Sequence, residues 1–274
     1  MDLLLLLKAA IMGIVEGITE FLPISSTGHL ILASELMNFW TKEKSDLFVV
    51  AIQMGAIAAV IYQYWGKLWG AAIGLFTGEK KGRHLGISII VASIPIMIVG
   101  LTFGDTVKTL LFNDISVAIG LIVGGLVIWW VEKHPPKVNA AEVENISIKE
   151  AIYIGLIQVL ALIPGTSRSG ATIIGGMMLG VSRKAATEFS FFLGIPVIVG
   201  AGLLDLLKNY HIYQTTQDWT VFFVGLIVSF ISALILIRVL VAYVSKRNFM
   251  VFAWYRIASG LLILLFALTG WRLW

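Results

Sequence analysis

Long apolar runs recur along the whole chain and constrain its fold more than any other feature. They lie near 3–22, 47–66, 86–103, 115–131, 148–163, 187–207, 220–244 and 250–270. A bilayer-spanning α-helix needs about 20 predominantly apolar residues, and most of these runs are near that length. The chain is 58% hydrophobic and only 13% charged, which is more apolar than a soluble domain. The sequence therefore predicts a polytopic, all-α integral membrane protein.

The first and fifth apolar runs differ from the others. Each leads into a proline-containing polar string and then into a short amphipathic stretch, at 25–37 and 168–180. A helix that breaks at mid-depth and returns as a second short helix is a re-entrant hairpin, and its irregular backbone must be buried in protein or line a wet cavity. We expect two such hairpins, at 3–37 and 148–180, beside about six full crossings.

Lysines and arginines gather in four loops, which we assign to the cytoplasmic side because inner loops carry an excess of these residues. They are Lys80, Lys81 and Arg83; Lys133 and Lys137; Arg183 and Lys184; and Lys246 and Arg247. An outer loop is expected at 104–114. On this assignment the 148–180 hairpin enters from the inner side, the 3–37 hairpin enters from the outer side, and both termini lie outside.

A weak internal repeat agrees with this opposed topology. A shift of 142 residues pairs Gly13 with Gly155, Glu16 with Gln158, Ser25 with Ser167, and Gly28 with Gly170. Chance is the alternative for so few matches. We expect one integral domain over 1–274, with inverted repeats near 1–134 and 147–274. Many transporters share this architecture, so a carrier or flippase for a phosphorylated polyprenyl lipid is the alternative function.

The first polar string, at 16–29, reads E-G-I-T-E-F-L-P-I-S-S-T-G-H. Glu16 and Glu20 lie one helical turn apart on the same face. Two carboxylates this close in a low-dielectric site disfavour double ionisation unless a cation lies between them. A divalent metal such as Mg²⁺ or Ca²⁺ is one candidate for that cation. An arginine or a helix end would also stabilise the pair.

The hydroxyls that follow Pro23 lie where a new helix would begin. They belong to Ser25, Ser26 and Thr27. A helix N-terminus binds phosphate readily, so we expect these residues near a phosphate, with simple helix capping as the alternative. His29 lies three residues after Ser26, which supplies a candidate nucleophile and a candidate base within one turn.

The second polar string, at 164–172, reads P-G-T-S-R-S-G-A-T and predicts a cradle for an anion. Gly165 and Gly170 permit close backbone approach, and the guanidinium of Arg168 suits phosphate oxygens. The hydroxyl donors are Thr166, Ser167, Ser169 and Thr172. Arg168 could also pair with Glu16 or Glu20.

Other polar residues are less informative. Gln53 and Glu188 are expected to line the cavity, whereas Arg256 is expected to reach the membrane interface from a helix end. No Walker-type string is present, which argues against a nucleotide substrate. The small net charge of +4 gathers in the loops, so nucleic acid is not an expected partner.

The two polar strings, with G-V-S-R-K-A-A-T-E-F-S-F at 180–191, resemble those of the BacA-type undecaprenyl-diphosphate phosphatases of the bacterial cytoplasmic (inner) membrane. The resemblance extends over the whole chain in length and hydropathy. It implies hydrolysis of undecaprenyl diphosphate to the monophosphate lipid carrier of peptidoglycan synthesis, bacitracin resistance, and an active site open to the outer, periplasmic side.

The resemblance also implies roles for individual residues. Glu16 and Glu20 form its acidic motif, Ser26 is the favoured nucleophile with His29 assisting, and Arg168 binds the phosphates. The expected partners are a polyprenyl diphosphate substrate and membrane lipids. Whether the chain forms a homodimer, and whether it needs a divalent cation, stays open at this point.

Overall fold

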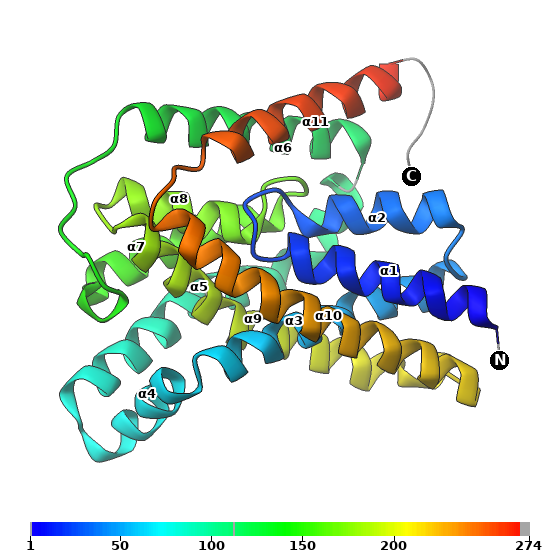
Figure 1. Cartoon of the computed structure of the whole chain (residues 1–274), viewed down its shortest axis with the longest axis horizontal. Helices are drawn as coiled ribbons and strands as arrows, with labels where there is room; N and C mark the ends of the chain where they lie inside the picture. Colours follow the sequence, from blue (N-terminus) through cyan, green and yellow to red (C-terminus); the bar gives the residue numbers. More distant parts are fainter. Residues whose placement is uncertain (1, 112, 269–274) are drawn as a thin grey trace.

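The computed structural model describes residues 2–111 and 113–268, which form a bundle of helices with no β-sheet among them (Figure 1). The first half contains α1 (Leu3–Thr19), α2 (Ser26–Met37), α3 (Lys42–Gln63), α4 (Trp65–Thr77), α5 (Lys80–Leu111) and α6 (Asp114–Lys133). The second half contains α7 (Ile148–Gln158), α8 (Arg168–Met178), α9 (Arg183–Asn209), α10 (Thr216–Val244) and α11 (Met250–Leu268). Three short 3-10 helices, η1 (Val143–Asn145), η2 (Val159–Leu162) and η3 (Tyr210–Ile212), complete the described elements.

Six of the described helices are long and apolar enough to cross a membrane. They are α3, α5, α6, α9, α10 and α11. The prediction of a multi-pass helical membrane protein with about six crossings is therefore confirmed. The segment expected as a loop at 104–114 is helical over most of its length, because α5 continues to Leu111. The part of α5 that is long and apolar enough to cross a membrane ends at Gly104, so the connection between the two crossings lies where it was expected. Residues 269–270 of the eighth predicted run lie outside the described residues.

Two helix-turn-helix pairs occupy the positions of the predicted hairpins. α1 ends near Glu20 and α2 begins at Ser26, while α7 continues into η2 and α8 begins at Arg168. In Figure 1 the α1–α2 pair enters from the end that holds the N-terminus, and the α7–α8 pair enters from the opposite end. Their tips meet in the middle of the molecule. Re-entry of the two pairs into a bilayer stays a prediction.

The same backbone conformation occurs immediately before α2 and before α8. Ser25 has a φ of 71° and Ser167 a φ of 70°. Residues other than glycine rarely adopt such positive φ values. These two serines are paired by the 142-residue shift. Such strained positions persist only where surrounding contacts hold them, and they gather at functional sites.

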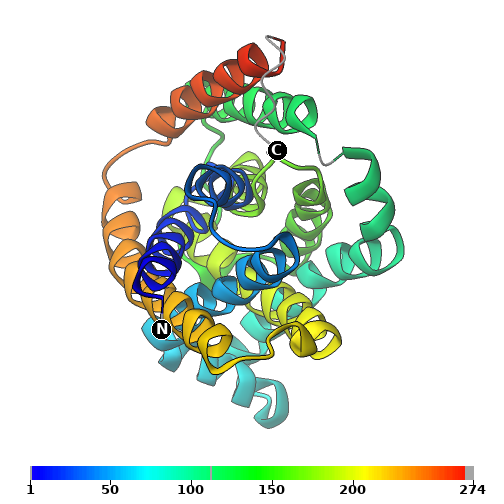
Figure 2. The ribbon, with the colours of Figure 1, turned by 90° about the vertical axis from the view of Figure 1, so that its right-hand side faces the viewer.

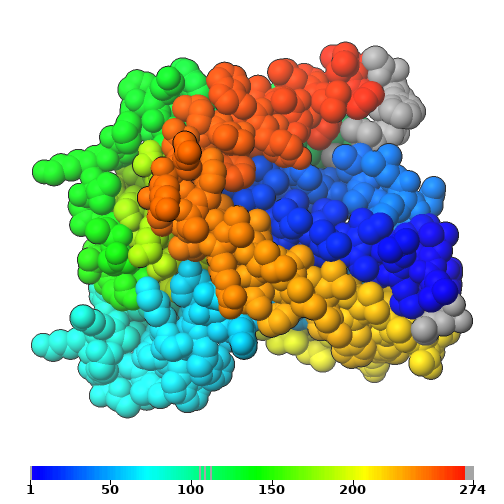
Figure 3. All heavy atoms as spheres, in the orientation of Figure 1, coloured from blue at the N-terminus to red at the C-terminus, as the bar shows by residue number. Residues whose placement is uncertain are grey.

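Helices from the two halves pack across each other. α1 lies along α10 and α7 lies along α5, while α3 contacts α9 and α6 contacts α11 (Figure 2). Small residues allow the first two contacts: a Cβ on Gly13 would lie 2.6 Å from the carbonyl of Gly225, and one on Gly155 would lie 2.4 Å from the carbonyl of Ala92. Figure 3 shows α10 lying against α1 on the face in view. The first helix of each half thus packs against a helix of the other half. Inverted repeats would give this arrangement. The repeats and the single domain stay proposals.

The basic loops lie at one end of the molecule. Figure 1 shows the α4–α5 turn, the 134–147 loop and the α10–α11 connection at its left end, opposite the N-terminal end of α1. This distribution is the one that the loop charges predicted for a membrane protein with a cytoplasmic and an outer end.

Candidate active site

The tips of the two hairpins contact each other directly. The Ser169 hydroxyl donates to the Leu22 carbonyl over 2.8 Å, and the Arg168 guanidinium pairs with the Glu20 carboxylate over 2.8 Å. The two polar strings, which are more than a hundred residues apart in sequence, therefore form one cluster.

A serine hydroxyl, a carboxylate and a guanidinium lie in a row at the centre of this cluster. Ser26 Oγ donates to Glu20 Oε2 over 2.6 Å, and Arg168 Nη2 donates to Glu20 Oε1 over 2.8 Å. Ser26 and Glu20 are both nearly buried. Ser26 is also the first residue of α2, where free backbone N–H groups and the positive end of the helix dipole favour an anion. The row places a hydroxyl beside a proton acceptor and a cation.

The far edge of the Arg168 guanidinium is held by α9. Arg168 Nη1 donates to the Ser190 carbonyl over 2.5 Å, while the buried Nε has no hydrogen-bond partner. A Cβ on Gly194 would lie 2.8 Å from Nη2, so glycine at this position of α9 makes room for the guanidinium. The expected ion pair of Arg168 with an acidic residue is thus formed with Glu20.

Glu16 lies one turn before Glu20 and is fully buried, and neither of its carboxylate oxygens has a hydrogen-bond partner. Within the described part of the chain, no group of three or more acidic or histidine side chains is placed to hold a metal ion. Mg²⁺ is commonly held by one or two carboxylates plus phosphate oxygens of a substrate. The unpartnered oxygens of Glu16 fit that arrangement, with Glu20 as the second carboxylate.

His29 lies in the same turn of α2, but both of its ring nitrogens bond groups other than Ser26. Its Nδ1 donates to the Ser25 carbonyl over 2.7 Å, which leaves Nε2 to accept from the Tyr255 hydroxyl over 2.6 Å. The two rings stack with centroids 5.7 Å apart. Tyr255 was not predicted, although a Tyr-Arg pair inside the apolar α11 was a signal in the sequence.

Several predicted phosphate donors hydrogen-bond within the protein. Ser167 Oγ accepts from the backbone N–H of Gly170 and so caps α8, and Thr172 Oγ1 donates to Ser190 Oγ over 2.7 Å. With Ser169, these residues build the walls of the site. The Thr27 and Thr166 hydroxyls form no hydrogen bond to any of the described residues, which leaves them able to contact a ligand.

The predicted glycines of the second string are used for packing inside the protein. Gly165 has φ +82°, and a Cβ there would lie 2.3 Å from the Val117 carbonyl of α6. A Cβ on Gly170 would lie 3.2 Å from Arg256 Nη1. The close backbone approach expected from these glycines is therefore an approach to α6 and to Arg256.

Arg256 is buried, so the expectation that it reaches the interface is wrong. Its Nη1 donates to the Pro23 carbonyl over 2.9 Å, and its Nη2 donates to the carbonyls of Gly120 and Gly165 over 2.9 Å each. One guanidinium thus binds the tip of the first hairpin, the tip of the second hairpin and α6. The buried carbonyls at these tips need donors, and Arg256 supplies them.

A cavity of about 950 Å³ extends from the hairpin tips along α2, α3 and α9. Thr27, Gln53 and Gly165 are among its lining residues. Glu188, which was expected to line the cavity, is not among them. It accepts a hydrogen bond from Lys67 Nζ over 3.1 Å instead.

Comparison with known proteins identifies the family. Residues 9–262 match the family described as "Bacitracin resistance protein BacA". The chain belongs to this family. "Undecaprenyl-diphosphatase 1" of Acinetobacter baylyi is 80% identical over 274 residues, which is 100% of both chains. The "Undecaprenyl-diphosphatase" of Psychrobacter cryohalolentis is 62% identical over 271 residues, or 97% of each chain, and "Undecaprenyl-diphosphatase 2" of Rhodospirillum rubrum is 50% identical over 274 residues, covering 100% of this chain and 99% of the relative.

The BacA-family match confirms the resemblance inferred from the two polar strings. It spans both hairpins and reaches through most of α11, so it includes Tyr255 and Arg256 as well as the predicted motifs. The roles of the individual site residues stay proposals.

Proposed function

We propose that this protein is an enzyme that hydrolyses undecaprenyl diphosphate to undecaprenyl phosphate and inorganic phosphate. The observation that carries the proposal is the row formed by Ser26, Glu20 and Arg168. It brings a hydroxyl, a proton acceptor and a phosphate-binding cation together inside a membrane protein. The names of relatives at 80% and 62% identity support the substrate. The reaction returns the lipid carrier to peptidoglycan synthesis and lowers the amount of diphosphate that bacitracin sequesters.

In the proposed first step, Ser26 Oγ attacks the terminal phosphorus while Glu20 takes the hydroxyl proton. The bond from that phosphorus to the bridging oxygen breaks, and undecaprenyl phosphate leaves. The proton on Glu20 passes to the departing undecaprenyl phosphate, which leaves Glu20 ionised. In the second step, Glu20 takes a proton from the water that attacks the phosphoserine. The bond from phosphorus to Ser26 Oγ then breaks, this proton returns to Ser26 Oγ, and inorganic phosphate leaves. Glu20 is assigned as base because Ser26 donates to it, whereas His29 is bonded to Ser25 and Tyr255.

Arg168 and the N-termini of α2 and α8 stabilise the charge that develops on the phosphoryl oxygens. The hydroxyls of Thr27 and Thr166 bind the phosphate directly, because they have no partner among the described side chains and backbone groups. Ser25, Ser167, Ser169 and Thr172 position the two helix starts. His29 orders the first turn of α2 through its bond to the Ser25 carbonyl.

A divalent cation, Mg²⁺ or Ca²⁺, would be held by Glu16 and Glu20. It would neutralise charge on the diphosphate, while Glu16 alone offers two unpartnered oxygens to it. Phosphate release should then fall steeply on strong chelation and return when the cation is restored. Unchanged release under chelation contradicts this part of the proposal.

We place the protein in the bacterial cytoplasmic membrane with its active site open to the outer, periplasmic side. The cavity that reaches the hairpin tips opens beside α2 and the C-terminal part of α9, at the end opposite the basic loops. Whether the chain forms a homodimer is left open by the sequence, and the mass of the solubilised protein tests it.

The direct test is phosphate release from polyprenyl diphosphate by purified protein. Arg168→Ala and Ser26→Ala should each lose about 100- to 1000-fold in rate, as expected when a preorganised donor or a nucleophile is removed. Ser88→Ala is the matched control, because Ser88 lies on α5 outside this cavity and its hydroxyl bonds only the His84 carbonyl of the same helix. Normal turnover by Ser26→Ala would transfer the nucleophile role to another group.

The opposed hairpins support a second function, which is transport of a phosphorylated polyprenyl lipid across the membrane. A carrier needs the anion site but no nucleophile. Ser26→Ala should therefore retain lipid transfer in reconstituted vesicles if the protein is a carrier, and it should lose only hydrolysis.

A further inference from the structure

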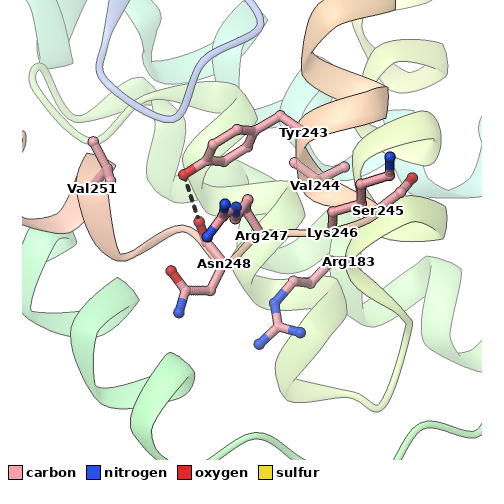
Figure 4. A pocket seen from close by; sticks show the side chains of 8 residues that line it. All are labelled: Arg183, Tyr243, Val244, Ser245, Lys246, Arg247, Asn248 and Val251. Atoms are coloured by element: carbon pink, nitrogen blue, oxygen red, sulfur yellow. Dashed lines mark hydrogen bonds between the residues drawn. The ribbon is translucent and has the colours of Figure 1, made fainter.

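A second hollow, of about 680 Å³, lies at the other end of the molecule from the active-site cavity. It is formed where α10 ends, where α11 begins, and beside the N-terminus of α9. Its lining residues are Arg183, Tyr243, Val244, Ser245, Lys246, Arg247, Asn248 and Val251. Figure 4 shows the side chains of Arg183, Arg247 and Asn248 around the same open space. All three helices are long and apolar enough to cross a membrane, and the hollow lies at their ends, which is where the membrane surface is expected.

One wall of this hollow is fixed by a buried carboxylate. Arg183 Nε donates to Glu132 Oε1 over 3.0 Å, and the same oxygen accepts from the backbone N–H of Phe249 over 2.8 Å. The charge of Arg183 is therefore balanced, and the 245–249 connection is tied to α6. Contacts within the protein therefore fix this wall, and no ligand is needed to form it.

Two other cations that line the hollow are unbalanced. Lys246 and Arg247 are exposed, and their side chains form no ion pair and no hydrogen bond within residues 2–111 and 113–268. The side-chain oxygen of Asn248 accepts a hydrogen bond from the backbone N–H of Met250. Its side-chain nitrogen is therefore left to donate to a ligand. The hollow thus offers two positive charges and an amide donor to an anion.

An apolar stripe leads away from these charges along α11. Val251, Trp254, Leu261 and Leu265 recur at spacings of three, seven and four residues, so they share one face of the helix. Each is more than half exposed, at 64%, 57%, 54% and 57% respectively. Val251 belongs both to the stripe and to the lining of the hollow, which makes the two surfaces continuous.

We propose that this hollow binds the phosphate headgroup of an anionic phospholipid of the inner leaflet, with an acyl chain lying on the α11 stripe. A phosphate diester would be held by Lys246, Arg247 and the Asn248 amide. The apolar continuation selects a membrane lipid over a free phosphate, because a free anion would leave the stripe unused. The site is distinct from the candidate active site and does not rest on the proposed hydrolysis.

The test is lipid binding to the full-length, detergent-purified protein, measured by native mass spectrometry with phosphatidylglycerol and with phosphatidylcholine. The double variant K246Q/R247Q should bind phosphatidylglycerol about tenfold more weakly, because each cation near an anionic surface contributes to attraction. The matched control K80Q/K81Q removes the same charge from the exposed N-terminal end of α5 and should change binding less than about twofold. Neither pair should alter phosphatidylcholine binding.

Equal loss of phosphatidylglycerol in both double variants would overturn the proposal, because the attraction would then be general to exposed basic segments. Displacement of phosphatidylglycerol by inorganic phosphate at matched concentrations would assign the hollow to a free anion and would also overturn it. Phosphate release in detergent and the unfolding temperature should be unchanged in K246Q/R247Q. If that variant does not fold, Arg247→Gln measured against Lys81→Gln makes the same comparison with one charge removed from each segment.

Discussion

At the scale of single residues, the two candidates for the general base, Glu20 and His29, have different hydrogen-bond partners. The Glu20 carboxylate accepts the Ser26 hydroxyl, whereas both ring nitrogens of His29 have other partners. Glu20→Gln keeps the shape of the side chain but removes the proton acceptor and the ion pair with Arg168. We expect it to lower the rate of phosphate release by at least about 100-fold, within the usual range for loss of general base catalysis.

The matched change at histidine is Tyr255→Phe, which removes only the hydrogen bond to His29 Nε2. One neutral hydrogen bond contributes roughly 0.5–1.5 kcal/mol, so the rate should fall by no more than about tenfold. Steady-state phosphate release by the two variants and by His29→Gln checks the assignment. If His29→Gln loses as much activity as Glu20→Gln while its unfolding temperature is unchanged, the base role belongs to His29.

At the scale of helices and their connections, Arg256 of α11 determines how the two hairpin tips meet. Its Nη1 and Nη2 bond the carbonyls of Pro23 and Gly165 separately, whereas a lysine would have to serve both from a single nitrogen that cannot take the positions of both. Arg256→Lys should therefore leave a buried carbonyl unpaired, which destabilises the fold by about 1–3 kcal/mol.

Thermal unfolding in detergent measures that loss. The control is Arg238→Lys. The Arg238 guanidinium is exposed, and its Nε donates a single hydrogen bond to Gln63 Oε1. Arg256→Lys should unfold at a lower temperature than this control and should also release phosphate more slowly, because the tips carry Ser26 and Arg168. Identical unfolding temperatures for the two variants would show that Arg256 does not hold the tips together.

The elements that the sequence predicted well are those decided by composition over many residues. The spans follow from runs of apolar residues such as 220–244, and the helix breaks follow from Pro23 and Pro164. The role of Arg256 was not predictable, because a lone arginine near a helix end can extend to the interface or turn inward. Its carbonyl partners come from three distant parts of the chain. Likewise, whether a serine such as Ser167 caps a helix or faces a ligand depends on contacts that spacing does not fix.

At the scale of the whole molecule, the charged loops and the cavity lie at opposite ends. The end with the α4–α5 turn and the 134–147 loop carries lysines and arginines, whereas the cavity opens beside the start of α3. If the basic end is cytoplasmic, the hairpin tips are accessible from the outer face of the membrane. The lipid diphosphate would then be hydrolysed on the side where cell-wall precursors are used.

The chain has no cysteine, so single cysteines report this orientation without background. Glu43→Cys lies at the exposed start of α3, and Val138→Cys lies in the 134–147 loop with 55% of the native side chain exposed. A membrane-impermeant maleimide added to intact spheroplasts should label Glu43→Cys and leave Val138→Cys unlabelled. In inverted membrane vesicles the pattern should reverse, because the cytoplasmic face is then outward. Labelling of Val138→Cys in sealed spheroplasts would place the basic end outside and would require the active site to open to the cytoplasm.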